Sequence, residues 1–384
     1  MIFLFSQYKL RNFNFRLLIY ILALSTIGVL VIRSAANGSM EDSRVTRQIL
    51  GIGVGLLIAL FLAVVDYHRI LNLGILAYLA CIGLLVWVLV SGIAKGGATR
   101  WVVVPVLGQL QPSEFTKIGL IVFFSWYFHK YQERINQVSI LAATAVLFGF
   151  PVLLILLEPN LSTSLIIIMV FTAMIFVAGL SYRWIFGILA VLTPIAAGLI
   201  YLLQYEMIPF LRGYQAQRIL SFIYPDKYQE NNLQQDNSVI AIGSGQLWGK
   251  GLNNTTIASV KNGNFLVEEA TDFIFAIIGE ELGFVGSLVV IGLYLLIIYE
   301  CLWMARQARD NSGKLLCTGM AALIGFQSFS NIAVASKFFP NTGLPLPFIS
   351  YGVSSLLSMY VGIGIVLNVG LQRKNTHNQG GVIT

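Results

Sequence analysis

The chain has 384 residues, of which 57% are hydrophobic and only 11% are charged. Roughly a quarter of the residues in a soluble domain are charged, so this composition excludes an ordinary soluble globule. The net charge is +7, but the Lys and Arg residues lie singly between apolar runs, which excludes the clustered basic surface of a nucleic-acid-binding protein.

Apolar segments recur along the whole chain, and about 20 helical residues are enough to cross a hydrocarbon core about 30 Å thick. The expected membrane spans are 17–32, 49–65, 75–94, 115–128, 139–157, 161–180, 184–204, 273–299, 315–336 and 351–371. Arg33, directly after the first span, argues against cleavage of that span as a signal peptide. We therefore predict an all-α polytopic membrane protein of about ten transmembrane helices, formed by a single domain over 1–384.

The distribution of Lys and Arg in short loops predicts the orientation of the chain. With both termini in the cytoplasm, about 12 of these residues lie inside and about 7 outside, once the long loop after the seventh span is left out. Residues 373–384 are then a cytoplasmic tail. In this orientation the chain's three histidines all fall on the inner side, which excludes a His-ligated metal site outside: His68, His129 and His377. Cys81, Cys301 and Cys317 form no CxxC pair, so neither a disulfide framework nor a thiolate metal site is expected.

Charged residues at the ends of two expected spans are candidates for function, because a charge in a bilayer is costly unless it is paired or hydrated. Glu114 and Lys117 are three residues apart at the start of the fourth span, so they face the same way on a helix. Pro112 just before them suits a first helical turn. Glu158 precedes Pro159 at the break between two spans. A structural ion pair and a simple turn are the alternatives to a functional role.

Two further regions place polar residues at membrane depth. Glu280 and Glu281 lie inside the eighth span, where pairing with Lys or Arg from a neighbouring helix is favoured over catalysis. Gln327, Asn331 and Lys337 precede a segment, 340–347, whose three prolines and glycine exclude a regular helix. Irregular backbone at this depth is tolerated where it is buried in protein or lines a wet cavity.

A long polar segment, 205–272, is expected to form an extracellular loop between helices 7 and 8. Its glycine-rich part, 243–251, lacks the spacing of a phosphate-binding loop, so a tight turn is the better interpretation. The loop ends at Thr271 and Asp272, either of which is a candidate N-cap for the eighth span. Asp272 also lies at the outer membrane surface, where it can meet a lipid-borne reactive centre.

Several motifs occur in a fixed order along nearly the whole chain. They are Gly97-Ala98-Thr99-Arg100-Trp101, Gln111-Pro112-Ser113-Glu114 with Lys117, Glu158-Pro159-Asn160, Tyr214-Gln215 with Arg218, Gly243-Ser244-Gly245, Thr271-Asp272-Phe273 with Glu280-Glu281-Leu282-Gly283, and the run from Gly343 to Gly352. In this set the chain resembles the SEDS family, the RodA and FtsW group of peptidoglycan polymerases. Short polar termini favour a RodA-like member. The chain departs from the family pattern at four positions: Asn160, Val267, Ala270 and Val353.

The resemblance implies a glycosyltransferase that polymerises lipid II onto a lipid-linked nascent glycan at the outer face of the bacterial cytoplasmic membrane. It also implies a class B penicillin-binding protein and other elongation or division proteins as partners, and it places the catalytic carboxylate at Asp272. The hypothesis is that Asp272 is the general base of an inverting displacement that releases undecaprenyl diphosphate. The predicted substrate-binding residues are Arg100, Glu114, Lys117, Glu158, Arg218, Lys250, Gln327, Asn331 and Lys337.

A divalent cation, Mg²⁺ or Mn²⁺, is compatible with diphosphate chemistry, although no ligand cluster in the sequence requires one. Two other functions fit the same composition. A lipid II flippase would use a cavity containing Glu114, Lys117 and Glu158, but the paired broken helices of many transporters are not evident in the sequence. A pure scaffold for a division or elongation complex leaves the buried charges unexplained.

Overall fold

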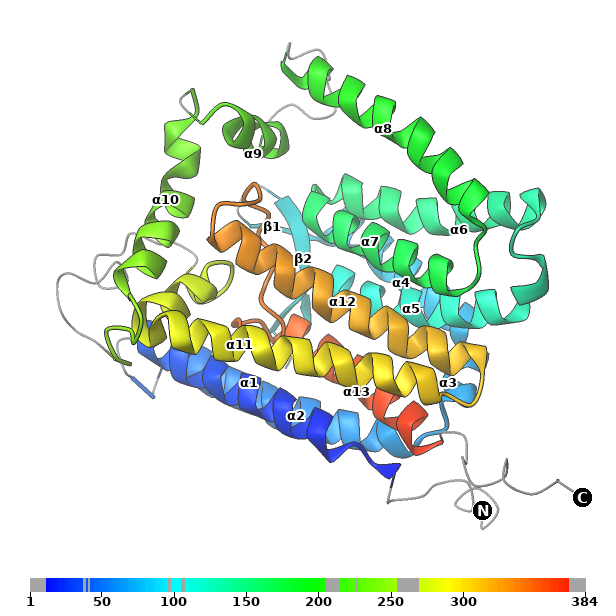
Figure 1. Ribbon diagram of the computed structural model, residues 1–384, viewed down its shortest axis with the longest axis horizontal. Coiled ribbons are helices and arrows are strands. Elements are labelled where there is room, and N and C mark those ends of the chain that lie inside the picture. Colours follow the sequence, from blue (N-terminus) through cyan, green and yellow to red (C-terminus); the bar gives the residue numbers. More distant parts are fainter. Residues whose placement is uncertain are drawn as a thin grey trace, which may run out of the picture.

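Long apolar helices packed side by side make up most of the protein (Figure 1). The computed structural model describes residues 12–36, 39–40, 42–95, 98–104, 108–204, 214–225, 227–253 and 269–372. The helices are α1 (Phe15–Ala35), α2 (Ser43–Val64), α3 (Tyr67–Asn72), α4 (Gly74–Ser91), α5 (Pro112–Lys130), the short 3-10 helix η3 (Gln132–Arg134), α6 (Val138–Leu157), α7 (Leu161–Val177), α8 (Tyr182–Gln204), α9 (Tyr214–Ile223), α10 (Gln229–Ser244), α11 (Ile274–Gln307), α12 (Asn311–Ala335) and α13 (Val353–Leu371). The predicted tail, 373–384, lies outside the described residues.

Seven helices of the described chain are long and apolar enough to cross a membrane: α1, α2, α4, α6, α11, α12 and α13. The prediction of a helical polytopic membrane protein is confirmed. The three other expected spans coincide with α5, α7 and α8, of which α7 is apolar but only 17 residues long. The count of about ten spans therefore stays a prediction.

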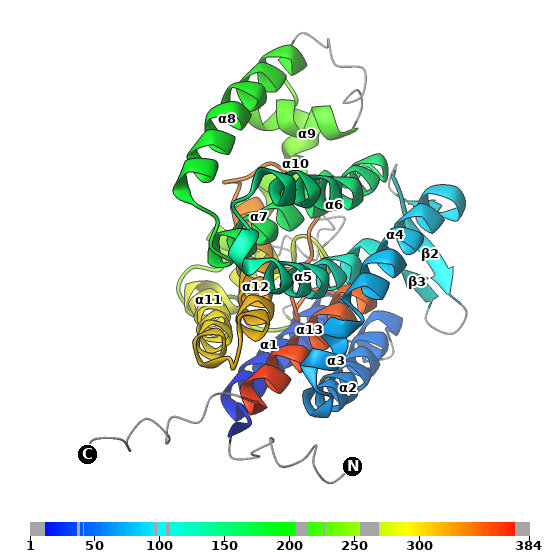
Figure 2. The same ribbon diagram turned by 90° about the vertical axis from the view of Figure 1, so that its right-hand side faces the viewer.

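Helices α12 and α13 form the centre of the bundle (Figure 2). Within their most apolar stretches 72% and 83% of the residues are buried, against 39% or less in α1, α2, α4 and α6. Small residues let α13 approach α2 closely, since a Cβ on Gly364 would lie 2.8 Å from the Cα of Ala59. The peripheral helices expose leucines, valines and phenylalanines, as expected of a surface solvated by lipid.

A small antiparallel sheet joins α4 to α5, in a segment for which no strand was expected. Its strands β1 (Ile93–Lys95), β2 (Ala98–Val104) and β3 (Gly108–Leu110) lie in the order β1-β2-β3, with Val103 paired to Gln109. The run Trp101-Val102-Val103-Val104 has the aromatic and β-branched residues that favour strands, and this signal was missed. Strand β2 carries Arg100.

The segment between α12 and α13 is irregular, as its prolines predict. Side chains of neighbouring helices bind its backbone: Gln327 donates to the carbonyl of Pro345 (2.9 Å) and the hydroxyl of Tyr294 donates to that of Pro347 (2.5 Å). Polar groups of the unwound backbone are therefore satisfied inside the protein.

The predicted long loop contains two helices, α9 and α10. Helix α10 docks on the end of α12, where Gln235 donates to the carbonyls of Val334 (2.9 Å) and Phe339 (2.8 Å). Ser238 donates to the carbonyl of Ala335 (2.7 Å). The last carbonyls of a helix lack partners within it, so the amide-rich sequence of α10 satisfies the end of α12.

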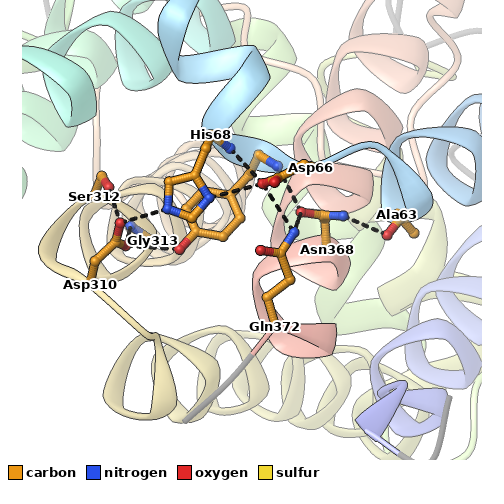
Figure 3. A network of polar contacts seen from close by, with 9 residues as sticks. Ala63, Asp66, His68, Asp310, Ser312, Gly313, Asn368 and Gln372 are labelled. Carbon is orange, nitrogen blue, oxygen red and sulfur yellow. Dashed lines mark hydrogen bonds and ion pairs between the residues drawn. The ribbon is translucent and has the colours of Figure 1, made fainter. Parts of the chain in front are cut away.

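A polar network closes the opposite end of the bundle, where α2, α11 and α13 end (Figure 3). The two ring nitrogens of His68 lie 2.9 Å from Asp66 Oδ1 and 3.0 Å from Asp310 Oδ2. Asp310 also accepts from the hydroxyl of Tyr67 (2.9 Å), while Asn368 donates to the carbonyl of Ala63 (2.7 Å). This Asp310 network, comprising Asp66, Tyr67, His68, Asp310 and Asn368, ties the ends of α2, α3, α12 and α13 together.

Candidate functional site

Asp272 lies in the turn directly before α11, and the backbone there is held by α12 and by the segment between α12 and α13. Asn331 donates through Nδ2 to the carbonyls of Asp272 (2.8 Å) and Leu344 (2.7 Å). The hydroxyl of Ser350 donates to the carbonyl of Thr271 (2.5 Å). The N-cap of α11 is Phe273 and no side chain caps the helix, so the expectation that Thr271 or Asp272 is the cap was wrong. The backbone contacts position Asp272 instead.

Two arginines from distant parts of the chain approach Asp272. Arg100 comes from β2, and its guanidinium donates to the carbonyl of Pro159 and, through Nε, to that of Glu158 (3.4 Å). Arg218 comes from α9. Both arginines interact electrostatically with Asp272. Arg100, Arg218 and Asp272 lie far apart in the sequence, so only the fold brings them together.

Gly343 marks how closely Asp272 and Arg218 approach each other. A Cβ on this glycine would lie 3.1 Å from Asp272 Oδ2 and 3.5 Å from Arg218 Nη1. Its φ of 67° is in the left-handed region, which favours glycine. The sequence suggested Gly343 only as part of the irregular segment, so its place beside the carboxylate was missed.

Both arginines are partly buried. Burial lowers the pKa of Arg218 to about 10, and the charge of Asp272 opposes that shift. Burial likewise lowers the pKa of Arg100, against the charges of Asp272 and Glu158. Both side chains remain cationic at neutral pH. A partly desolvated cation gains more from an added anion than an exposed one does.

Several buried acceptors around these charges have no hydrogen-bond partner among the described residues. They are both carboxyl oxygens of Glu158, Asn341 Oδ1 and Thr342 Oγ1. Glu158 lies in the turn between α6 and α7, and burial raises its pKa to about 8 while Arg100 opposes the shift. Buried polar groups are normally bonded, so this concentration of unpaired groups is typical of a ligand site. We call Arg100, Glu158, Arg218 and Asp272 the Asp272 cluster.

A second buried group lies deeper in the bundle. Lys117 Nζ is 2.8 Å from Glu114 Oε1 and 2.7 Å from Gln327 Oε1, and its side chain is 1% exposed. The pairing expected from the i,i+3 spacing is present. Gln327 connects this group to the carbonyl of Pro345, and thereby to the segment that holds Asp272.

Two other residues predicted to bind substrate lie in separate ion pairs. Lys250 Nζ is 2.7 Å from Glu280 Oε1, and Lys337 pairs with Asp236 of α10. The structure thus brings Arg100, Glu158, Arg218 and Asp272 together, and Asn331 binds the backbone of Asp272. In the described parts of the chain, no three His, Cys, Asp or Glu side chains lie together as metal ligands, and the divalent cation stays a prediction.

Comparison with known proteins gives consistent matches over nearly the whole chain. The model of the FtsW/RodA/SpoVE family, described as cell cycle protein, matches residues 15–375. The chain is 33% identical over 379 residues to the probable peptidoglycan glycosyltransferase FtsW of Trichlorobacter lovleyi, covering 95% of this chain and 94% of that one. It is 34% identical over 364 residues to the peptidoglycan glycosyltransferase MrdB of Escherichia coli, covering 93% of each. A solved structure, described as "Structural coordination of polymerization and crosslinking by a peptidoglycan synthase complex", matches with a TM-score of 0.77 and 30% identity over 93% of this chain and 97% of that one.

Proposed function

Because the chain belongs to the FtsW, RodA and SpoVE family, we propose that the Asp272 cluster is the active site of a peptidoglycan glycosyltransferase. The substrates are lipid II and a lipid-linked nascent glycan at the outer face of the bacterial cytoplasmic membrane. Both termini of the multi-pass chain are cytoplasmic, in agreement with the Lys and Arg distribution. One observation carries the assignment: two partly buried arginines converge on the carboxylate of Asp272.

Asp272 is the general base. It takes the proton of the sugar 4-hydroxyl of one substrate as that oxygen attacks C1 of the other, with inversion at C1. The bond from C1 to the diphosphate oxygen breaks, and the electron pair leaves with undecaprenyl diphosphate. A single displacement needs one base, unlike glycoside hydrolysis, which uses two carboxyl groups. Asn331 and Ser350 hold the backbone of Asp272 in place for this step.

Arg100 and Arg218 bind the diphosphate of the leaving group. A guanidinium matches phosphate oxygens with paired N–H donors, and it stabilises the negative charge that grows as the bond breaks. Glu158 is protonated below its raised pKa of about 8, so its carboxyl group donates a hydrogen bond to substrate at neutral pH. A divalent cation would add charge to the same diphosphate.

The partner proposed for the chain is a class B penicillin-binding protein within an elongation or division complex. The solved synthase complex that matches this fold is described as coordinating polymerization and crosslinking, which supports a crosslinking partner for this chain. The lipid II flippase depended on a cavity shared by Glu114, Lys117 and Glu158. Lys117 is instead enclosed by Glu114 and Gln327, so no observation favours that alternative.

The direct test incubates the purified chain, alone and with its partner, with lipid II and separates the glycan products by size. Polymer formation that disappears in Asp272→Asn supports the proposal. An Asp272→Asn protein that is folded and still polymerises at the wild-type rate contradicts it.

A further inference from the structure

Helix α11 is broken at Gly283, whose φ of 66° and ψ of −164° are not helical. In a continuous helix the N–H of Phe284 would bond to the carbonyl of Glu280, and that of Val285 to the carbonyl of Glu281. The break separates both pairs. It also divides α11 into a short segment, 274–282, which follows Asp272, and a long segment, 284–307.

The backbone of the glycine-rich loop, 245–251, occupies the break. The N–H of Phe284 donates to the carbonyl of Gln246 (2.8 Å), and that of Val285 donates to Leu247 (3.2 Å). In return the carbonyl of Glu280 accepts from the N–H of Lys250 (2.9 Å), and the carbonyl of Glu281 accepts from Gly251 (3.0 Å). The four groups released by the break are therefore all bonded to one loop, as buried backbone groups require.

Glycines make this fit possible. A Cβ on Gly249 would overlap the carbonyl oxygen of Glu281, and one on Gly245 would overlap that of Gly279. From the other side, a Cβ on Gly283 would overlap the backbone nitrogen of Gly249. The pairs Gly245 and Gly249 on the loop and Gly279 and Gly283 on the helix have the same four-residue spacing, which lets two backbones touch.

Side chains add to the backbone contact. Lys250 pairs with Glu280, whose side chain is 1% exposed. Ser34 of α1 donates to Glu281 Oε1 and accepts from the N–H of Asn253 (3.0 Å), just after the loop. The Lys or Arg partner expected for one of these glutamates from a neighbouring helix comes instead from the loop. Removing one partner of a buried pair leaves an uncompensated charge, so Lys250 and Glu280 depend on each other.

We infer that the 245–251 loop is a positioning element that holds segment 274–282, and Asp272 at its start, in the reactive geometry. Lys250 is then a positioning residue and not a ligand of the substrate diphosphate. A nine-residue helix is too short to keep its direction alone. Segment 274–282 is fixed near its start by Asn331 and Ser350 and at its end by the loop. This inference rests on the proposed role of Asp272.

The test compares two glycines with the same backbone conformation. Gly249 and Gly251 have φ of 80° and 88°, but a Cβ on Gly251 has no atom within 4 Å. Each alanine variant carries the same conformational strain, and only Gly249→Ala pushes the loop away from α11. We expect Gly249→Ala to lose about 100-fold in kcat with KM for lipid II nearly unchanged, because a displacement of about 1 Å has that effect. Gly251→Ala keeps most of its activity.

Hydrogen exchange supplies a readout that does not depend on catalysis. The amides of Phe284 and Val285 should exchange faster in Gly249→Ala than in Gly251→Ala, since their bonds to Gln246 and Leu247 are lost, and the amides of 274–282 should follow because the segment is no longer held at its end. If Gly249→Ala does not fold, the same measurement is made on Gly245→Ala, with Gly243→Ala as its control. A Cβ on Gly243 would have no atom within 4 Å, whereas one on Gly245 would overlap the carbonyl oxygen of Gly279. Equal exchange and equal turnover within each pair would overturn the inference.

The ion pair is tested by exchanging its charges. Lys250→Met should reduce kcat, and the double variant Lys250→Glu with Glu280→Lys should recover most of the loss with an unchanged KM. If the swapped protein is folded but has a raised KM, Lys250 binds substrate and the inference is wrong. Asp272→Asn separates the two proposals: it abolishes turnover and leaves the exchange of 274–285 as in the wild type. Retained turnover in Asp272→Asn would refute the active site while the exchange data still decide the role of the loop.

Discussion

The Asp272 cluster and the Asp310 network lie at opposite ends of the same bundle, and they differ in how their carboxyl groups are hydrogen-bonded. In the network, both carboxyl oxygens of Asp310 accept hydrogen bonds: Oδ1 from Tyr67 and Gly313, and Oδ2 from Ser312, with His68 beside it. In the cluster, neither carboxyl oxygen of Glu158 has a partner among the described residues. Hydrogen-bonded charges hold the helices together at the network, whereas the unpaired carboxyl group of Glu158 is the reason that the cluster is the candidate ligand site.

The pKa values follow the same contrast. Burial would raise the pKa of Asp310, but hydrogen bonds from Gly313, Ser312 and Tyr67 outweigh it and lower the pKa. At Glu158 burial dominates and raises the pKa to about 8. The results are opposite because Asp310 has hydrogen-bond donors around it, whereas Glu158 is fully buried and faces mainly the charge of Arg100.

Replacement of Asp272 gives the largest effect expected from this comparison. Asp272→Asn should reduce polymerisation of lipid II by about 1,000-fold, which is the scale of a lost general base. The fold should be retained, because Asn331 binds the backbone of Asp272, and the unfolding temperature should fall only modestly through loss of the charge that faces Arg100 and Arg218. Glycan synthesis assays and thermal unfolding in detergent measure the two quantities. A large drop in the unfolding temperature would make Asp272 a structural residue like Asp310.

Replacement of Arg218 ranks next. Arg218→Gln should lower kcat/KM by about 100-fold, the effect of removing one preorganised donor from a developing negative charge. Arg218→Lys should give an intermediate loss, because it keeps the charge without the planar pair of donors. Lys337→Met is the control, since Lys337 pairs with Asp236, which is not a member of the cluster. Equal losses in Arg218→Gln and Lys337→Met would contradict the diphosphate site.

Asp310→Asn should destabilise the fold by about 1–3 kcal/mol, because it weakens the bonds of partly buried donors. Turnover per folded molecule should not change. The pH dependence has a definite sign: a carboxyl group with a lowered pKa stabilises the fold above its unfolded pKa of about 3.8, and that stability is lost as the pH falls through the folded value. Unfolding scans below pH 4 should therefore be less steep in Asp310→Asn. If the unfolding temperatures of the variant and the wild type fall equally steeply below pH 4, the network does not hold these helix ends.

Glu158→Gln should have the smallest effect at neutral pH, since the protonated carboxyl group and the amide are both neutral donors. Because the folded pKa of about 8 exceeds the ordinary value of 4.5, the wild type loses stability as the pH rises through this window. Glutamine does not titrate, so the variant should become progressively more stable than the wild type from pH 4.5 to pH 8. Unfolding temperatures across that range provide the measurement. A constant difference would mean that folding does not raise the pKa of Glu158.

Local chemistry was enough to predict much of the architecture. The apolar segments predict where the helices lie, and Pro112 begins α5, as its fixed φ suggests. The i,i+3 spacing of Glu114 and Lys117 predicts a pair that the structure contains. The prolines of 340–347 predict an irregular segment, and its position directly before α13 follows from the chain order.

Other features depend on contacts that no local pattern encodes. The sequence predicts by the same reasoning that Lys250 and Arg218 both bind substrate. In the structure, Lys250 pairs with Glu280, whereas Arg218 approaches Asp272. The glycines of 243–251 suggested only a turn, because the break in α11 that they fill lies more than 30 residues further along the chain. A charged side chain in a sequence has many possible partners, and only the packing selects one.

The sequence by itself determined that this protein is a helical membrane protein with a carboxylate, Asp272, at the start of a span. Hydrophobic length and helix-breaking residues are local properties, so they can be read without a structure. The tertiary structure alone decided which charges meet that carboxylate and how its helix is held. Convergence of β2, α9 and α11 on one point is a property of packing between distant elements, and burial there changes the chemistry of each group it encloses.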